Sequence, residues 1–225
     1  MSQLARKCIA SWKEFCPNYE IIEWNENNYD ISINKYAKQA YEAKKYAFLS
    51  DYARVDILYN NGGIYLDVDV EILKSLDNLL HHQAFAGFES KQKVNLGLGF
   101  GAVPNHSLIG LFKKAYGQRI FIKENGKYDY TTVVEFISDI LIAKGLSQNN
   151  ELQEIDGCMI YPTEFFQPIN INTRKLTITD NTYTIHHYAS SWYPPQRKLL
   201  QNISKLLGSK ITSIVRKILK REIDA

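Results

Sequence analysis

Two carboxylates, Asp67 and Asp69, are the residues whose types and spacing most directly suggest chemistry. They follow the apolar run Ile64-Tyr65-Leu66, which predicts a short buried strand. In open α/β sheets, ligands bind at the carboxyl ends of the strands. Two like charges this close repel each other, and a divalent cation with oxygen ligands, Mg²⁺ or Mn²⁺, would relieve the repulsion. The pair therefore predicts a metal site that could neutralise a phosphate leaving group.

Other interpretations of this motif stay open. Asp is common after strands, so the pair could lie in a solvated loop. A calcium loop is excluded, because its sixth and twelfth positions require Gly and Glu, whereas counting from Asp67 gives Ile72 and Asn78. An aspartyl-phosphate phosphatase also follows a strand with D-x-D-x-[TV], which residues 67–70 fit. That motif usually opens its fold, whereas a strand and several helices are predicted before it here.

A polar face on the preceding helical segment could line the same cleft. Asp51, Arg54 and Val55 stand at i, i+3 and i+4 and therefore share one helical face. Arg54 could hold Asp51 in a fixed rotamer, and both could bind sugar hydroxyls. An ordinary structural ion pair is the alternative.

Residues 47–70, AFLSDYARVDILYNNGGIYLDVDV, resemble the signature of the DxD-motif sugar transferases. This family, glycosyltransferase family 32, includes capsular polysaccharide glycosyltransferases and yeast mannosyltransferases, and the segment is also similar to the catalytic core of clostridial glucosylating toxins. The similarity extends over most of the chain, to HHYASSW near residue 192. It implies a GT-A-type, Rossmann-like α/β fold, a nucleotide-sugar donor, Mn²⁺ or Mg²⁺, and transfer with retention of anomeric configuration.

The resemblance also implies roles for particular residues. Asp69 would be the main metal ligand, and Asp67 would contact the ribose, the sugar or the metal through water. Asp51, Arg54 and Tyr65 would hold the donor.

The closing motif, residues 186–192, implies a further metal ligand. Neighbouring strand residues point to opposite faces, so only one histidine can face the carboxylates, and we favour His187. Ser190 and Trp192 would lie near the diphosphate.

The resemblance implies that Glu89 and the glycine-rich segment 95–101 correspond to the segment that lies beside the sugar and the acceptor in this family. Glycine permits close backbone approach to a ligand, although a loop joined to a packed strand has the same composition. With Asp67 and Asp69, Glu89 and Asn95 complete the expected catalytic set, with Asn95 near the anomeric carbon. No carboxylate is clearly placed as a nucleophile, which favours same-face displacement assisted by the diphosphate.

Alternating helices and strands must position these residues. Apolar periodicity predicts helices at 4–15, 34–43, 46–59, 107–116 and 132–144, and strands at 19–24, 64–66, 84–88, 98–103, 159–161 and 183–188. This alternation predicts an α/β sandwich with a mainly parallel central sheet. The family's usual first strand, I-P-K-x-I-H-x-x-W, is expected to be missing, and with it part of the base pocket.

Composition is that of an ordinary globular protein, with 225 residues, 45% hydrophobic residues and a formal charge of +3. No apolar run reaches the length of a membrane span. The three cysteines have no metal-type spacing, which predicts a reducing, cytoplasmic location. Residues 196–225 carry +6 and the remainder −3, a distribution that argues against a nucleic-acid partner.

The expected organisation is a catalytic domain at 1–195 and a basic amphipathic helical tail at 196–225. Such a tail could contact the inner membrane surface through residues 197–221, or could pack on the body or on another subunit. The predicted function is a retaining transferase that moves a hexose from a UDP-sugar to a saccharide or lipid-linked acceptor in bacterial capsular polysaccharide synthesis. The alternatives are a DxD-type phosphatase and a degenerate nucleotide-sugar-binding subunit.

Overall fold

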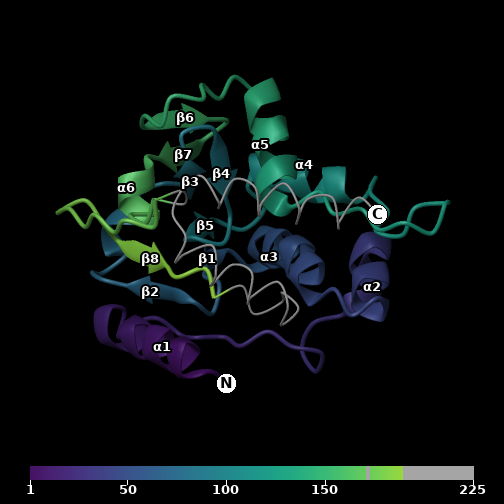
Figure 1. The fold of residues 1–225 in the computed structure, drawn as a ribbon, viewed down its shortest axis with the longest axis horizontal. Coiled ribbons are helices and arrows are strands. Elements are labelled where there is room, and N and C mark those ends of the chain that lie inside the picture. Colours follow the sequence, from purple (N-terminus) through teal and green to yellow (C-terminus); the bar gives the residue numbers. More distant parts are fainter. Residues whose placement is uncertain (171–172, 190–225) are drawn as a thin grey trace.

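The computed structural model describes residues 1–170 and 173–189 (Figure 1). Its helices are α1 (Gln3–Phe15), α2 (Lys35–Glu42), α3 (Tyr46–Asn61), α4 (Ser107–Tyr116), α5 (Val133–Ala143) and α6 (Thr163–Phe166), with short 3₁₀ turns at Ile31–Ile33 and Asp77–Leu79. Its strands are β1 (Gly63–Tyr65), β2 (Val70–Ile72), β3 (Ala84–Ser90), β4 (Lys93–Asn95), β5 (Phe100–Ala102), β6 (Gln153–Ile155), β7 (Cys158–Tyr161) and β8 (Thr184–His186).

The central sheet has six strands in the order β1-β5-β3-β7-β6, with β4 also paired to β3. The α/β class is confirmed, but the prediction of a mainly parallel sheet is wrong. Among the described strands only β3 and β7 pair in parallel, so the sheet is mixed. Two residues separate β3 from β4 and two separate β6 from β7, and connections this short join only antiparallel strands.

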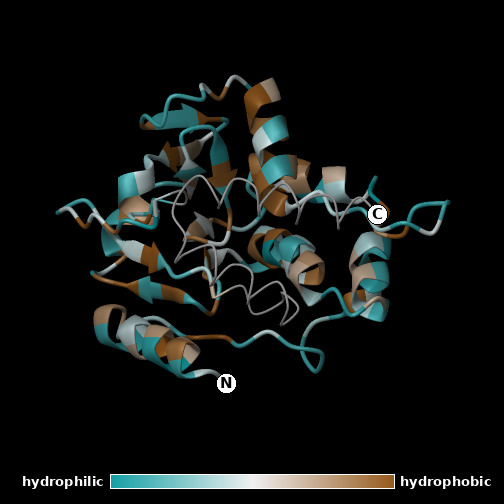
Figure 2. Cartoon of the chain, viewed as in Figure 1, coloured by the Kyte–Doolittle hydropathy of each residue, from teal (hydrophilic) through white to brown (hydrophobic). Residues whose placement is uncertain are grey.

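The sheet packs on both faces, as the alternation along β3 shows. Ala84, Ala86 and Phe88 enter the main core with α2 to α5, whereas Phe85 points the other way, into a smaller core with β2 and the end of α1. β2 pairs with β8 to form a separate two-stranded sheet beside α1 (Figure 1). Figure 2 shows hydrophilic and hydrophobic residues mixed around α1 and α2, as expected of helices with one exposed face.

α3 runs through the middle of the molecule and delivers the chain to the DXD strand. Half of its residues are buried, including the polar Asp51, Arg54 and Asp56. The helix ends at Gly62, whose φ of +69° is one that glycine adopts without strain. A Cβ at Gly62 would lie 2.6 Å from Cδ of Pro104. The glycine therefore permits both the sharp turn into β1 and the close approach of the loop after β5.

The strand predicted at residues 19–24 is not formed. This segment has no regular secondary structure, and Ile21, Ile22 and Trp24 are exposed. Its β-forming side chains meet the local preference for a strand, but a strand also needs a hydrogen-bonded neighbour, and no other described strand lies beside it.

Several predictions fall outside the described residues. These are the roles of Ser190 and Trp192, the domain boundary at 195, and the amphipathic helix at 196–225 with its membrane contact at 197–221. Within residues 1–170 and 173–189, no helix has the length and apolar character needed to cross a membrane.

Candidate active site

The DXD residues form a tight turn between β1 and β2. The Val70 N–H donates to the Asp67 carbonyl at 3.0 Å, and the Asp67 N–H donates to the Gly97 carbonyl at 3.2 Å. Val68 projects outward and is 59% exposed, whereas both aspartates are half-buried. The turn thus presents two carboxylates on the inner side of the backbone.

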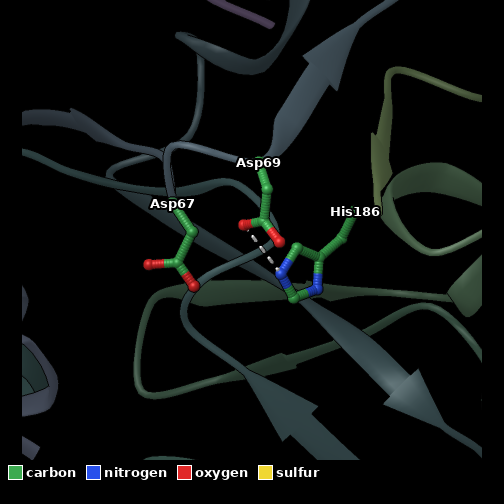
Figure 3. Close-up of side chains that lie close together, drawn as sticks. All are labelled: Asp67, Asp69 and His186. Carbon is green, nitrogen blue, oxygen red and sulfur yellow. Dashed lines mark ion pairs between the residues drawn. The ribbon is translucent and has the colours of Figure 1, made fainter. Parts of the chain in front are cut away.

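His186 completes a three-residue cluster with these carboxylates (Figure 3). One potential ligand atom from each of Asp67, Asp69 and His186 lies within 4.8 Å of the others. The Nε2 atom of His186 is 3.2 Å from Oδ1 of Asp69. The register of β2 and β8 fixes this approach, because His186 is paired directly with Val70, the residue after Asp69.

His187 lies on the opposite side of β8, so the prediction that it faces the carboxylates is wrong. Its Nε2 atom is 2.8 Å from Oε2 of Glu71, and Glu71 also pairs with Lys7 of α1 at 2.8 Å. As the alternation of strand side chains predicts, the two histidines have different partners, and His186 is the one beside Asp69. Which one enters depends on the β2–β8 register, which the local sequence does not specify.

The cluster is suited to hold a cation. Two hard oxygen donors and an imidazole are ligands that Mn²⁺ accepts. Nδ1 of His186 is buried and has no partner among the described residues. Burial opposes protonation of His186, but its hydrogen bond to Asp69 and the charge of Asp69 outweigh this and raise its pKa. Burial likewise opposes ionisation of Asp69, but the contact with His186 holds the pKa of that carboxyl below its usual range.

A buried ion network supports Asp67 from behind. The Nη2 atom of Arg54 lies 3.1 Å from Oδ1 of Asp51 and 3.3 Å from Oδ1 of Asp67. The Tyr65 hydroxyl donates to the same Asp67 oxygen at 2.9 Å, and the Arg54 guanidinium lies over the Tyr65 ring. Asp51 accepts a hydrogen bond from the Val133 N–H, at the start of α5. Four residues expected at the site are therefore brought together, with Arg54 joining the helix to the DXD turn.

Asn95 and Glu89 form the third part of the site. The Asn95 side chain donates to Glu89 at 3.3 Å and accepts from the Gly97 N–H at 2.7 Å. Burial raises the pKa of Glu89, although its hydrogen bond with Tyr188 opposes the rise. Gly97 lies between this group and Asp67. It is so close to Asp67 that a Cβ at position 97 would overlap the Asp67 side chain.

Tyr188 is a site residue that the sequence did not single out. Its hydroxyl donates to Glu89 at 2.9 Å, and its ring centroid lies 4.3 Å from that of His186. Its φ of +51° is unusual for a bulky residue. The neighbouring Ala189 N–H donates to Asp69 at 2.7 Å. The segment after β8 thus bonds to both Glu89 and Asp69. These contacts join residues far apart in the sequence, so local sequence patterns do not predict them.

Comparison with known proteins finds similarity to DXD-motif glycosyltransferases. Residues 2–86 match the family described as the glycosyltransferase sugar-binding region containing a DXD motif. The chain is 26% identical over 189 residues to an uncharacterized glycosyltransferase of Acanthamoeba polyphaga mimivirus, covering 80% of this chain and 70% of that protein. It is 34% identical over 95 residues to inositol phosphoceramide mannosyltransferase 3 of Schizosaccharomyces pombe, covering 37% of this chain and 26% of that protein. No solved structure matches significantly.

Proposed function

Because residues 2–86 match the glycosyltransferase sugar-binding region containing a DXD motif and the chain is similar to two glycosyltransferases, we propose that it is a metal-dependent enzyme that transfers a hexose from a nucleotide sugar with retention of configuration. The observation that carries the proposal is the convergence of Asp67, Asp69 and His186 within 4.8 Å. The family match favours this activity over the phosphatase that the D-x-D-x-[TV] pattern also allowed.

Asp67, Asp69 and His186 would hold the cation, Mn²⁺ or Mg²⁺. When bound, it would supply positive charge to the diphosphate of the donor. Arg54, which is buried, holds the half-buried Asp67 in place through an ion pair. We propose that Asp51, Arg54 and Tyr65 also contribute to donor-sugar binding.

Glu89 and Asn95 are proposed to lie beside the anomeric carbon. Their mutual hydrogen bond fixes the Asn95 amide, whose oxygen is already used by Gly97. The amide N–H₂ therefore has one hydrogen left to donate to a sugar or acceptor oxygen. Same-face displacement needs such an oriented polar group but no protein nucleophile.

The donor and acceptor are proposed at the level of chemical class. A UDP-sugar is our first choice of donor, and a mannose donor belongs in the same panel because one relative is named a mannosyltransferase. The proposed acceptor is a saccharide or lipid-linked saccharide of a bacterial surface polysaccharide, reached at the cytoplasmic face of the membrane.

The decisive experiment compares three single substitutions by calorimetric titration with Mn²⁺. Asp69→Asn and His186→Ala should each weaken Mn²⁺ binding by at least about tenfold, because each removes a ligand. His187→Ala is the matched control and should bind Mn²⁺ like the wild type, since His187 contacts Glu71 instead. UDP-sugars and GDP-mannose are then titrated with Mn²⁺ present, and transfer is followed by release of the nucleoside diphosphate.

Each part of the proposal has its own contrary result. If all three variants bound Mn²⁺ with the affinity of the wild type, the proposed metal site would be ruled out. Tight, metal-dependent donor binding with no transfer to water or to any saccharide would identify a degenerate binding subunit instead of an enzyme.

A further inference from the structure

The site contains more negative charge than its described cations balance. The carboxyl groups of Asp51, Asp67, Asp69 and Glu89 are gathered within it. The buried Arg54 guanidinium already pairs with two of them, Asp51 and Asp67. A bound divalent cation offsets part of this excess, but a donor diphosphate adds further negative charge. An additional cation at the rim would favour donor binding.

Arg174 is a basic residue at that rim. Its guanidinium lies 5.4 Å from the centre of the Tyr188 ring, and Tyr188 contacts both Glu89 and His186. Arg174 is exposed and pairs with no carboxylate among the residues that the structure describes. It therefore stands one side chain away from the acidic cluster, with its hydrogen-bond donors available.

A tight turn holds Arg174 in this position. The Arg174 N–H donates to the Asn170 carbonyl at 2.8 Å, and the Asn170 N–H donates to the Lys175 carbonyl at 2.9 Å. Arg174 itself has a φ of +59°, a conformation that costs a non-glycine residue free energy and that clusters at ligand-binding sites. The turn and the cation–π contact together direct this arginine, rather than its neighbour Lys175, onto Tyr188.

We propose that Arg174 binds the diphosphate of the donor, an inference that rests on the proposed transferase function. Guanidinium groups recognise phosphate oxygens through paired hydrogen bonds. During transfer the bond between the anomeric carbon and the diphosphate oxygen breaks, and its electron pair stays on that oxygen. The acceptor oxygen forms the new bond, and its proton passes to the departing diphosphate. Arg174 stabilises the negative charge that this oxygen gains.

The test measures the affinities of UDP, UMP, GDP and GMP in saturating Mn²⁺, for the wild type, Arg174→Ala and Lys175→Ala. Arg174→Ala should weaken the diphosphate that binds the wild type by at least about tenfold and leave the monophosphate within about twofold. Lys175→Ala, an exposed basic control on the same turn, should change neither. Mn²⁺ affinity without nucleotide should be unchanged in both variants, which excludes a general disturbance of Tyr188 and His186.

The outcomes separate this inference from the function on which it rests. If the wild type and Arg174→Ala bind the diphosphate equally well, the proposed role of Arg174 is overturned. The transferase proposal is then still intact. Equal losses for diphosphate and monophosphate also overturn it. A wild type that binds Mn²⁺ but no nucleoside diphosphate sinks both proposals together.

Discussion

Close packing around Asp67 makes the site sensitive to single atoms. Gly97 accepts a hydrogen bond from the Asp67 N–H through its carbonyl, and its missing side chain leaves room for the Asp67 carboxylate and the Arg54 guanidinium. Its φ is outside the left-handed region, so space rather than backbone conformation requires glycine here. A side chain at position 97 should therefore displace the Asp67 carboxylate, and a substitution can test this directly.

Gly97→Ala should weaken Mn²⁺ binding by about tenfold or more, because the new methyl group must displace Asp67. The measurement is Mn²⁺ titration of the folded variant. Gly110→Ala, in α4, is a suitable control, since its Cβ would lie 2.8 Å from a ring carbon of Tyr59 in α3 and meets no group of the site. Both variants should lose stability. Loss of metal affinity in the control as well would show that the effect is not local.

Asp51 should make the folded state less stable as the pH rises. Burial raises its pKa to about 6, with Asp67 adding to the rise and Arg54 opposing it. Between its unfolded pKa of about 4 and this value, the folded chain holds a proton that the unfolded chain has lost, so stability falls with increasing pH through that window. The full loss, on the order of 2–3 kcal/mol, is reached above pH 6.

Asp51→Asn removes this titration, so the difference in unfolding free energy between pH 5 and pH 8 should shrink relative to the wild type. Urea unfolding at the two pH values measures it. Asp139→Asn, at an exposed position, should leave the difference unchanged. An Asp51→Asn variant that keeps the full wild-type pH dependence would contradict the assignment.

At the scale of elements, α1 stabilises β2, the strand that follows the DXD turn. β2 pairs with β8 on one edge, and α1 covers the other. The Ile72 N–H donates to Oγ of Ser11 at 2.9 Å, and the Trp12 indole N–H donates to the Val70 carbonyl at 2.7 Å. α1, which holds none of the candidate site residues, therefore satisfies backbone groups on the free edge of β2.

Ser11→Ala should destabilise the protein by about 1–3 kcal/mol, because it leaves the buried Ile72 N–H without a partner. Urea unfolding of the variant gives this value. Ser147→Ala, at an exposed loop position, should cost less than about 0.5 kcal/mol. A Ser11 variant as stable as this control would show that Ile72 finds another acceptor.

The sequence predicted where helices and strands lie better than it predicted which strands pair. Helices at 4–15, 46–59 and 107–116 are confirmed because an apolar face or a buried run is a local property. β2, β4 and β6 escaped notice, since each has only three residues and depends on a partner strand, which for β2 is the distant β8. Asp67, Asp69, Asp51 and Arg54 were found together because they lie within one continuous segment. The histidine that lies beside Asp69 was not the one predicted, because the pairing register is set by a contact across more than half the chain.

At the scale of the whole molecule, a bound cation should act as a cross-link between the DXD turn and β8. Ligands that bind only the folded state stabilise it by about 2.7 kcal/mol at one hundred times their Kd. For a chain of this size, that raises the midpoint of thermal unfolding by roughly 5–10 °C. Mn²⁺ should shift the wild type and His187→Ala by this amount, and Asp69→Asn by much less. Calorimetric scans with and without Mn²⁺ measure the shift, and equal shifts in all three proteins would contradict it.

The hydrogen bond between Asp69 and Ala189 joins residues 120 positions apart, and this separation has a consequence for synthesis. Asp67 and Asp69 leave the ribosome many seconds before β8 does. Throughout that interval the nascent chain carries the two aspartates without His186, so the three-residue site does not yet exist. The proposed metal site is therefore completed late in the life of each molecule, only when the final described strand docks against β2.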